Sequence, residues 1–566
     1  MTNLIETARL EIKSLVENGF KKAIQNKALP EAELNPFVVE IPADLSHGDF
    51  ATNVAMVNAR SFRQAPQKIA TAIVSEFDFS SCKYIKSAEI AGAGFINFWL
   101  KDSFYADTVS SAIREGEDYG KTDYGKGKKV MVEFVSANPT GPMHMGNARG
   151  GAIGDILAEA LSRSGYEVTR EFYINDAGNQ IEKFGLSLEV RYLQHFKGEE
   201  NVPLPEDCYQ GEDIKDRAEE YIAKYGDCLL DKSREERKKS LVDFALPLNI
   251  AKLKSDLEQY RIFYDVWFKE SQLHESGLVN EIIAKLGEKG LSYEKDGAIW
   301  YKATEFGGEK DEVLVRANGI PTYFAADIAY HYNKFVIRKF DKVINVWGAD
   351  HHGHVARLKG AMDALGVGGD KLDIVLMQLV RLLRDGKPYK MSKRTGKAVS
   401  LTDLIAEVPI DAARFFFNMR EPNSTLDFDL DLAAEQSKEN PVYYVQYAHV
   451  RICSILKKLG IDYNDAVSIL EKADLSLLSE PEAIELIRQI AIFPEEIVTS
   501  AKNYDPARLT RYSLELASLF HKFYGAVRVS GCEEELQRAR ITLCLATKSV
   551  LKTSLELLKI EVPEAM

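Results

Sequence analysis

The feature that most constrains the fold of this chain is a strand–helix–strand pattern that begins at residue 130. Residues 130–135 (VMVEFV) form a short apolar run, 148–165 (ARGGAIGDILAEALSRSG) place apolar residues on one helical face, and 166–174 (YEVTREFYI) again favour a strand. A strand, a helix and a strand within about 45 residues predict a βαβ unit, whose two strands are parallel. The sequence therefore predicts an α/β fold with a parallel sheet.

The alternation continues along the chain and then gives way to helices. Strand-like runs recur at 297–302, 313–319, 342–348 and 372–380, whereas helical periodicity alone remains after about residue 440. The C-terminal part is therefore predicted to be all-α.

The length of the chain indicates several domains, because 566 residues are too many for one hydrophobic core. Helical spacing near the N-terminus, followed by strand-like runs, predicts an α/β module at 1–110. We expect the central domain at 111–430, with a charged helical insertion near 185–290, and the helical domain at 431–566.

Composition excludes several classes of protein. No apolar run approaches the ~18 residues needed to span a bilayer, and the first residues are charged where an export signal would be apolar. The six cysteines form no C-x-x-C pair, which argues against both a protein-bound zinc and a disulfide framework. We therefore expect a reduced, cytoplasmic protein without a membrane segment. The net charge of −13 argues against a largely basic surface, although a local basic patch could still bind nucleic acid.

The loop 136–151 (SANPTGPMHMGNARGG) joins the first strand of the βαβ unit to its helix. A helix N-terminus at the carboxyl end of a parallel strand favours an anion. Gly141 and Gly146 would let a ring or a phosphate approach the backbone, and His144 and Asn147 could donate hydrogen bonds to it. This stretch alone does not decide between a phosphate site and a ligand-free turn, because such loops are common.

A second loop, 385–401 (DGKPYKMSKRTGKAVSL), gathers positive charge. A run of cations is usually a solvated surface loop. Here it follows the carboxyl end of a predicted strand in an otherwise acidic chain, which favours an anion site instead. The cations are Lys387, Lys390, Lys393, Arg394 and Lys397.

The two loops together resemble the signatures of class I aminoacyl-tRNA synthetases. The segment 144–147 (HMGN) resembles the HIGH signature, with Asn147 in place of its last histidine, and 390–394 (KMSKR) resembles KMSKS. Further segments are similar to arginyl-tRNA synthetases and extend the resemblance over nearly the whole chain. These segments are IPADLSHGDFATNVAM, REFYINDAGNQ, DVWFKES, YFAADIAYH, NPVYYVQYAHVRI and the terminal EVPEAM.

The resemblance implies a class I Rossmann-like parallel-sheet catalytic core, with the N-terminal module on the tRNA elbow and the C-terminal helices on the anticodon. It implies that arginine reacts with ATP, supplied with Mg²⁺ as substrate, to give arginyl-adenylate and pyrophosphate. The arginyl group then passes to its tRNA. Members of the family usually need tRNA for the first step, and the resemblance implies a monomer.

The resemblance also assigns residues to ATP. His144, Asn147, Lys390 and Lys393 would be catalytic, because charge grows on phosphate oxygens in the first step and cations or donors stabilise it. Asn147 could donate a hydrogen bond but could not carry charge. The ATP site would comprise Gly141, His144, Gly146, Asn147, Gly348, Asp350, Lys390, Met391, Ser392 and Lys393.

For the amino acid, the resemblance implies a pocket that matches a planar guanidinium with carboxylates and amides. Two acids have alternatives that remain open: Asp327 could be an ordinary helix-start acid, and Glu133 could pair with a lysine or arginine of the chain. His351 stands where relatives often carry Gln. The spacing of His351, His352 and His354 invites a metal, but we expect none, because no further ligand is evident. The predicted arginine site comprises Glu133, Ser136, Asn138, Tyr323, Asp327 and His351.

Three other functions fit parts of the sequence. A cysteine-specific synthetase would need zinc ligands that the scattered cysteines do not supply. A small-substrate adenylyltransferase has no use for a large helical C-terminal domain. A non-catalytic tRNA-binding paralogue would have no need of His144, Lys390 and Lys393.

Overall fold

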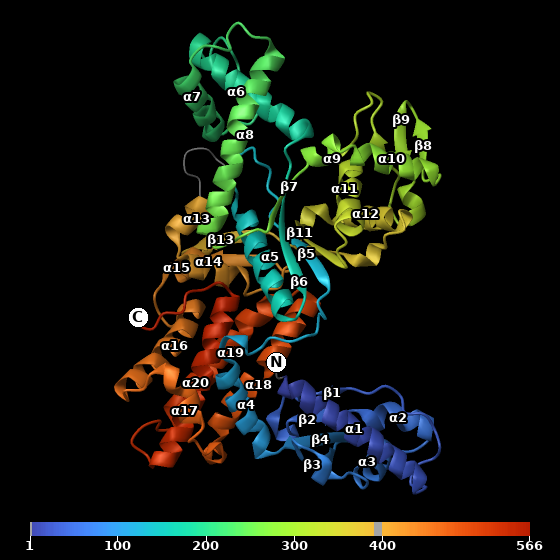
Figure 1. Ribbon diagram of the computed structural model, residues 1–566, viewed down its shortest axis with the longest axis vertical. Coiled ribbons are helices and arrows are strands. Elements are labelled where there is room, and N and C mark those ends of the chain that lie inside the picture. Colours follow the sequence, from blue (N-terminus) through green and yellow to red (C-terminus); the bar gives the residue numbers. More distant parts are fainter. Residues whose placement is uncertain (1–2, 390–398) are drawn as a thin grey trace.

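The computed structural model describes residues 3–389 and 399–566, and it contains a central α/β region, an N-terminal module and a helical C-terminal region (Figure 1). The central region holds the expected parallel sheet. Its strands lie in the order β12-β11-β5-β6-β7, and every neighbouring pair is parallel. They are β5 (Lys129–Glu133), β6 (Glu167–Ile174), β7 (Val266–Lys269), β11 (Lys342–Gly348) and β12 (Leu372–Met377).

The expected βαβ unit forms the middle of this sheet. Val130, Met131 and Val132 of β5 are fully buried, as in a strand covered on both faces. Helix α5 (Met145–Arg163) follows β5 and returns the chain to β6, while β11 pairs with the other side of β5. The strand order therefore reverses between β5 and β11, and such a reversal leaves a crevice at the carboxyl ends of the two strands.

Two strand-like runs that were expected to continue this alternation lie elsewhere. Residues 297–302 and 313–319 contribute to a separate antiparallel sheet of β8 (Ser292–Lys295), β9 (Ala298–Tyr301) and β10 (Glu312–Val315). The physical reason is the Asp296-Gly297 turn, in which both residues have positive φ (52° and 72°). A two-residue turn of this kind closes a hairpin, so these strands cannot belong to a parallel crossover.

The charged helical insertion forms a separate arm at the top of Figure 1. Its helices are α6 (Gly178–Lys197), α7 (Glu212–Tyr225) and α8 (Arg234–Gln259). They pack around their own small core, which includes Phe184, Tyr192 and Leu241. The range of 185–290 expected for this insertion also contains β7, which pairs with β6 in the parallel sheet, so the chain returns to the core before residue 290.

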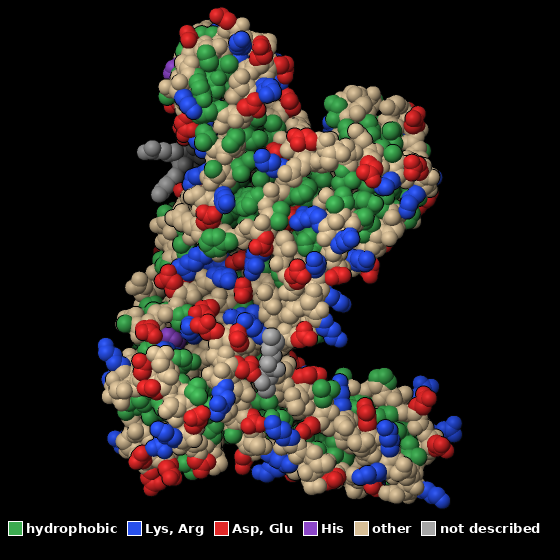
Figure 2. All heavy atoms as spheres, viewed as in Figure 1, with side chains coloured by type: hydrophobic (Ala, Val, Ile, Leu, Met, Phe, Trp, Pro, Cys, Tyr) green, Lys and Arg blue, Asp and Glu red, His purple; other side chains and the backbone are tan. Residues whose placement is uncertain are grey.

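A second lobe lies beside the insertion. It packs on the face of the parallel sheet that is opposite to α5. It comprises the β8–β10 sheet with α9 (Ser271–Glu275), α10 (Leu278–Glu288), α11 (Tyr323–Tyr332) and α12 (His352–Ala364). Its apolar core extends to Met131 of β5 and Val343 of β11. On the face shown in Figure 2, hydrophobic side chains gather in the hollow between this lobe and the insertion.

The run 372–380, expected as one strand, is divided into two elements. β12 ends at Met377, and the chain then enters β13 (Val380–Arg384), which belongs to a different sheet. β13 pairs with β14 (Lys387–Pro388) through another hairpin, and with β15 (Leu426–Asp429) in parallel. The short helices around this sheet are α13 (Leu401–Glu407), α14 (Ile410–Phe417) and α15 (Leu430–Ala434).

The N-terminal module has its own core and an antiparallel sheet in the order β1-β2-β4-β3. Helix α4 (Asp102–Glu115) leads out of it, crosses the boundary expected at residue 110 and packs against the C-terminal helices. The other elements are α1 (Leu4–Gln25), β1 (Val39–Glu40), β2 (Phe50–Thr52), α2 (Val54–Phe62), α3 (Pro66–Val74), β3 (Ile85–Ala91) and β4 (Phe95–Leu100).

Every element from Pro441 onward is helical, as expected. This region shares one continuous hydrophobic core with α5 and the parallel sheet, so it supports α5 directly. Within the described residues, no helix has both the length and the apolar character needed to cross a membrane. The main helices are α16 (Pro441–Lys458), α17 (Ala466–Leu470), α18 (Pro481–Asn503), α19 (Ala507–Ala526) and α20 (Glu534–Leu557).

Candidate active site

Two adjoining cavities occupy the crevice at the carboxyl ends of β5 and β11. The larger has a volume of about 1170 Å³ and the smaller about 690 Å³. Both cavities contact the end of β5 at Val135 and Ser136, and the end of β11 at Gly348 and Asp350. Their shared wall is therefore the place where ligands in the two cavities would meet.

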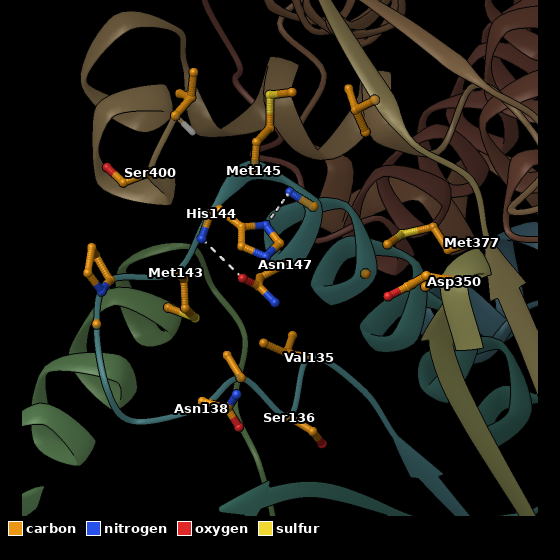
Figure 3. Close-up of a pocket in the computed structure, with 18 of the residues that line it drawn as sticks. Val135, Ser136, Asn138, Met143, His144, Met145, Asn147, Asp350, Met377 and Ser400 are labelled. Carbon is orange, nitrogen blue, oxygen red and sulfur yellow. Dashed lines mark hydrogen bonds between the residues drawn. The ribbon is translucent and has the colours of Figure 1, made fainter. Parts of the chain in front are cut away.

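The N-terminus of α5 forms one wall of the larger cavity (Figure 3). His144 is the N-cap residue, and its Nδ1 accepts a hydrogen bond from the Gly146 N–H at 3.1 Å. The Asn147 side-chain oxygen accepts from the His144 N–H at 3.0 Å, which completes a capping box. With these acceptors in use, His144 has Nε2–H and Asn147 has its amide N–H groups to offer a ligand.

The charge state of His144 follows from its surroundings. Partial burial in the cavity wall lowers the pKa of His144 below its usual value near 6.5. Protonation of Nδ1 would also break the hydrogen bond from Gly146. The cavity therefore favours a neutral imidazole that donates through Nε2.

The end of the lysine loop is fixed beside this helix. Met145 N–H donates to the Val399 carbonyl at 2.9 Å, and Leu401 N–H donates to the Met143 carbonyl at 2.8 Å. Val399 and Ser400 consequently line the larger cavity. The residues just before them, which include Lys390, Met391, Ser392 and Lys393, lie outside the described residues.

A buried arginine supports another part of the wall of this cavity, and no pattern in the sequence indicated it. Arg149 of α5 is fully buried, and its guanidinium donates to the backbone carbonyls of Gln378 (2.7 Å), Ser424 (2.9 Å) and Glu421 (3.1 Å). Burial lowers the pKa of this arginine to about 10. The bond to Gln378 ties the segment after β12, which lines the cavity, to the helix that carries His144 and Asn147.

The wall between the cavities contains a strained turn. Val135 and Ser136 have φ of +67° and +43°, and Ser136 N–H donates to the Phe134 carbonyl at 2.9 Å across a γ-turn. A β-branched residue rarely adopts this conformation, which costs on the order of 1–3 kcal/mol. Ser136 Oγ donates to Glu133 at 3.0 Å and accepts from the Tyr173 N–H at 3.2 Å. These bonds hold the turn where both cavities contact it.

Gly348 ends β11 and faces Asp350. A Cβ atom at Gly348 would lie 2.4 Å from Asp350 Oδ1, so a side chain at this position would displace the Asp350 carboxylate. The Asp350 side chain is 82% exposed and faces both cavities. It is therefore available to accept hydrogen bonds from a ligand.

The smaller cavity is acidic at its base. Burial raises the pKa of the Tyr173 phenol, and the negative charges of Glu270, Asp327 and Glu133 raise it further. Burial also raises the pKa of Glu270, with an added contribution from Asp327. This concentration of carboxylates around one ring suits a cationic ligand.

Glu133 has a partner within the chain. Lys334, which is fully buried, donates to Glu133, and its ammonium lies 4.0 Å from the centre of the Tyr330 ring. Lys334 also donates to Asn345 at 3.4 Å. The alternative that Glu133 meets a lysine of the chain is therefore what the structure shows, and Glu133 still lines the smaller cavity.

Asp327 is not a helix-start acid. Helix α11 begins at Tyr323, with Thr322 as N-cap, so Asp327 lies beyond the first turn. Tyr323 and Asp327 are four residues apart and both line the smaller cavity. One carboxylate oxygen of Asp327 lies 2.9 Å from Nε2 of His354.

The structure brings most of the predicted residues to these cavities. Asn138, expected in the amino-acid pocket, lines the larger cavity instead. Within the described parts of the chain, no group of three or more His, Cys, Asp or Glu side chains could hold a metal ion. The larger cavity alone receives Gly141, His144, Gly146 and Asn147, the smaller alone receives Glu133, Tyr323 and Asp327, and both are lined by Ser136, Gly348, Asp350 and His351.

Sequence reasoning missed Arg149, Lys334 and Arg357, and it considered His354 only as a possible metal ligand. A signal existed for two of them. Glu133 in an apolar strand required a cation, although nothing in the sequence pointed to Lys334. His354 and Arg357 are three residues apart on one helix, which places them side by side.

Comparison with known families identifies the class of protein that this fold and site define. The family model for the catalytic domain of class I tRNA synthetases (R) matches residues 108–453. The model of the DALR anticodon binding domain matches residues 445–566. The fold is that of a class I aminoacyl-tRNA synthetase, which confirms the predicted fold class.

The N-terminal module and the relatives then specify the family. Residues 13–100 match the arginyl tRNA synthetase N terminal domain. Arginine–tRNA ligases of Caldanaerobacter subterraneus subsp. tengcongensis and Acetivibrio thermocellus are 56% and 55% identical over 566 residues, with 100% of each chain covered. Thermus thermophilus arginyl-tRNA synthetase has the same fold, with a TM-score of 0.74 at 23% identity over 98% of this chain and 100% of that one. The chain belongs to the arginyl-tRNA synthetase family.

Proposed function

We propose that this enzyme, an arginine–tRNA ligase, binds ATP in the larger cavity and arginine in the smaller one. The observation that supports this division is the difference between their walls. A helix N-terminus and glycine backbone line the larger cavity, whereas carboxylates surround the smaller one. Arginine and ATP would meet at the γ-turn, where the arginine carboxylate attacks the α-phosphorus to give arginyl-adenylate and pyrophosphate.

In this first step the protein positions the reactants and stabilises charge. His144 Nε2–H and the Asn147 amide would donate to phosphate oxygens, assisted by the N-terminal end of α5. Lys390 and Lys393 would approach the leaving pyrophosphate from the loop whose far end is fixed beside α5. Mg²⁺ would arrive with ATP as part of the substrate.

The nucleoside half of ATP would lie near the end of β11. Gly348 leaves room for the ribose, and the exposed Asp350 carboxylate can accept hydrogen bonds from ribose hydroxyls. Gly141, Gly146, Met391 and Ser392 would complete the ATP site. Asn138, which lines the larger cavity, would contact the arginine ammonium or carboxylate at the boundary between the two cavities.

The guanidinium of arginine would reach Asp327 and Tyr323. A carboxylate accepts a planar guanidinium through two parallel hydrogen bonds, a geometry that an ammonium cannot reproduce. Glu133 and Ser136 would shape the base of the pocket, and His351 would contact the substrate from the loop after β11. Since Glu133 is paired with Lys334, Asp327 would supply the charge that the guanidinium recognises.

The second step transfers the arginyl group to its tRNA. We infer that the N-terminal module at 1–110 contacts the tRNA elbow and that the helices of 431–566 contact the anticodon, with the catalytic domain at 111–430 between them. One surface on these helices suits nucleobases. Arg451 lies 4.7 Å and 5.3 Å from the ring centres of Tyr447 and Tyr524, which are 40% and 38% exposed.

An ATP–pyrophosphate exchange assay over the amino acids, with and without tRNA, tests this proposal. We expect exchange with arginine and with no other amino acid. The exchange should reach its full rate only when tRNA is present. Exchange with another amino acid and not with arginine would overturn the proposal, and a full rate without tRNA would remove the tRNA requirement. The enzyme would act in the cytoplasm as a monomer, and gel filtration of the full chain tests the latter.

A further inference from the structure

A chain of hydrogen bonds runs from the acid in the smaller cavity to the antiparallel sheet. His354 Nε2 lies 2.9 Å from Asp327 Oδ2, Arg357 Nε donates to His354 Nδ1 at 2.7 Å, and Arg357 Nη1 donates to Glu312 Oε1 at 2.6 Å. Asp327 is on α11, His354 and Arg357 are on α12, and Glu312 is on β10. Three elements of one lobe are therefore joined by one chain of hydrogen bonds that ends at the Asp327 carboxylate.

The donors in this chain fix the tautomer of the histidine. Arg357 has no acceptor, so His354 Nδ1 must offer its lone pair to the Arg357 N–H. The proton of a neutral His354 then lies on Nε2, which donates to Asp327. Glu312 in turn holds the guanidinium of Arg357 in the plane that this arrangement needs.

Two aromatic rings hold the imidazole in place. The His354 ring lies 5.5 Å from Trp347 of β11 and 5.8 Å from Phe324 of α11, and its side chain is 12% exposed. The Arg357 guanidinium lies 5.5 Å from the Phe324 ring. The imidazole can therefore neither turn over nor leave Asp327 without breaking several contacts.

We propose that His354 is a positioning residue for arginine recognition, which holds the Asp327 carboxylate in the orientation that accepts a guanidinium. The hydrogen bond occupies one lone pair of Oδ2 and leaves Oδ1 and the second lone pair of Oδ2 to the substrate. The inference rests on the proposed role of Asp327. A guanidinium needs a carboxylate of fixed plane, whereas none of the four residues in this chain of bonds is among the described residues that line the larger cavity.

The test compares two substitutions at His354 in the full-length enzyme with tRNA present. His354→Ala removes the donor, and we expect the KM for arginine to rise about 10- to 100-fold with little change in the KM for ATP. In His354→Gln, the amide N–H can still donate to Asp327 while the amide oxygen accepts from Arg357. We therefore expect this variant to recover most of the arginine KM. His195→Ala, on an exposed histidine of α6 outside both cavities, serves as the matched control.

A second variant keeps the His354 side chain, so that no empty space is created in the protein interior. Arg357→Met, at a side chain that is 31% exposed, frees His354 Nδ1 and should raise the KM for arginine by about two- to fivefold. Thermal unfolding of each variant shows whether it is folded. If His354→Ala does not fold, the KM values for arginine of His354→Gln and Arg357→Met are compared instead to test the role of His354.

Combination with Asp327→Asn separates this inference from the proposed function. If His354 acts through Asp327, the double variant should be no worse for arginine than Asp327→Asn alone. An unchanged arginine KM in Asp327→Asn would overturn the proposed function itself. A raised KM in Asp327→Asn with an unchanged KM in His354→Ala, or equal losses in His354→Ala and His354→Gln, would overturn the role of His354 and leave the proposed function intact.

Discussion

The two cavities at the end of the parallel sheet differ in the groups that build them. The larger cavity relies on the start of α5, on glycine backbone and on neutral donors, and its main residues lie within one loop and two strand ends. The smaller cavity relies on charged side chains from α11, α12, β5 and β10, each held by a partner from another segment. A polyanion can thus be received by local backbone geometry, whereas a single cation requires side chains collected from distant parts of the chain.

The partners in the smaller cavity also make it rigid. Glu133 is paired with Lys334, and Glu171, which is fully buried, is paired with Arg338 and accepts from Tyr330. Removing one member of such a buried pair costs about 3–5 kcal/mol, because the other charge is left without compensation. Substitutions in the two cavities should therefore have different consequences.

The largest effect is expected for the ATP side of the site. Lys393→Ala should lower the rate of arginine activation about 10²- to 10³-fold, since one cation at the leaving pyrophosphate is lost, while the KM for arginine stays unchanged. Pyrophosphate exchange measures both quantities. Lys371→Ala, on an exposed lysine just before β12 and outside both cavities, is the matched control, and an unchanged exchange rate in Lys393→Ala would remove Lys393 from the site.

A smaller effect is expected for the amino-acid side. Asp327→Asn keeps the shape of the side chain but removes its charge, and it should raise the KM for arginine up to about 100-fold with the KM for ATP unchanged. Steady-state exchange kinetics check this, with Asp231→Asn in the insertion as control. A rise in the KM for ATP of the same size would mean that the two cavities do not divide the substrates as proposed.

Asn147 separates the two tasks of the α5 N-terminus. Asn147→Ala should lower the activation rate about tenfold, whereas Asn147→His should retain activity because histidine can also donate. Asn147→Asp should keep the capping bond to the His144 N–H and therefore the stability, yet lose activation rate because its charge repels phosphate. Exchange rates and thermal unfolding measured together test this, and an active Asn147→Asp enzyme would show that the amide donor is not needed.

The smallest effect concerns pH. Because the pKa of His144 is lowered below 6.5, less than half of the imidazole is protonated when the pH falls from 7.5 to 6.5, and the exchange rate should change less than about twofold from this cause. Below pH 6.5, His144 binds a proton more readily in the unfolded chain than in the folded one. The free energy of unfolding therefore decreases as the pH falls. A rate that rises on acidification to pH 6.5 would contradict a neutral His144.

The sequence predicted those parts of the structure that depend on local patterns. The βαβ unit, the helical C-terminal region and the loop around His144 each follow from a periodicity or a composition within about 45 residues. The predicted position of β9 and β10 was wrong, because the Asp296-Gly297 turn was not recognised as a hairpin signal. That error concerned turn chemistry and not hydrophobic pattern.

The long-range contacts that support the two cavities were beyond prediction for a different reason. Lys334 lies 201 residues from Glu133, and Arg149 lies 229 residues from Gln378. Neither pairing leaves a trace in the local sequence, because a buried charge is defined only by what the fold brings next to it. The acidic residues were therefore found by resemblance, and the residues that hold them required the structure.

A crystal structure of the full chain with arginine and a non-hydrolysable ATP analogue tests the division of the two cavities most directly. We predict the guanidinium within about 3 Å of the Asp327 carboxylate, and the phosphates at the N-terminus of α5, with the arginine carboxylate pointing at the γ-turn of Val135. A guanidinium bound in the larger cavity, or phosphates bound beside Asp327, would contradict the account.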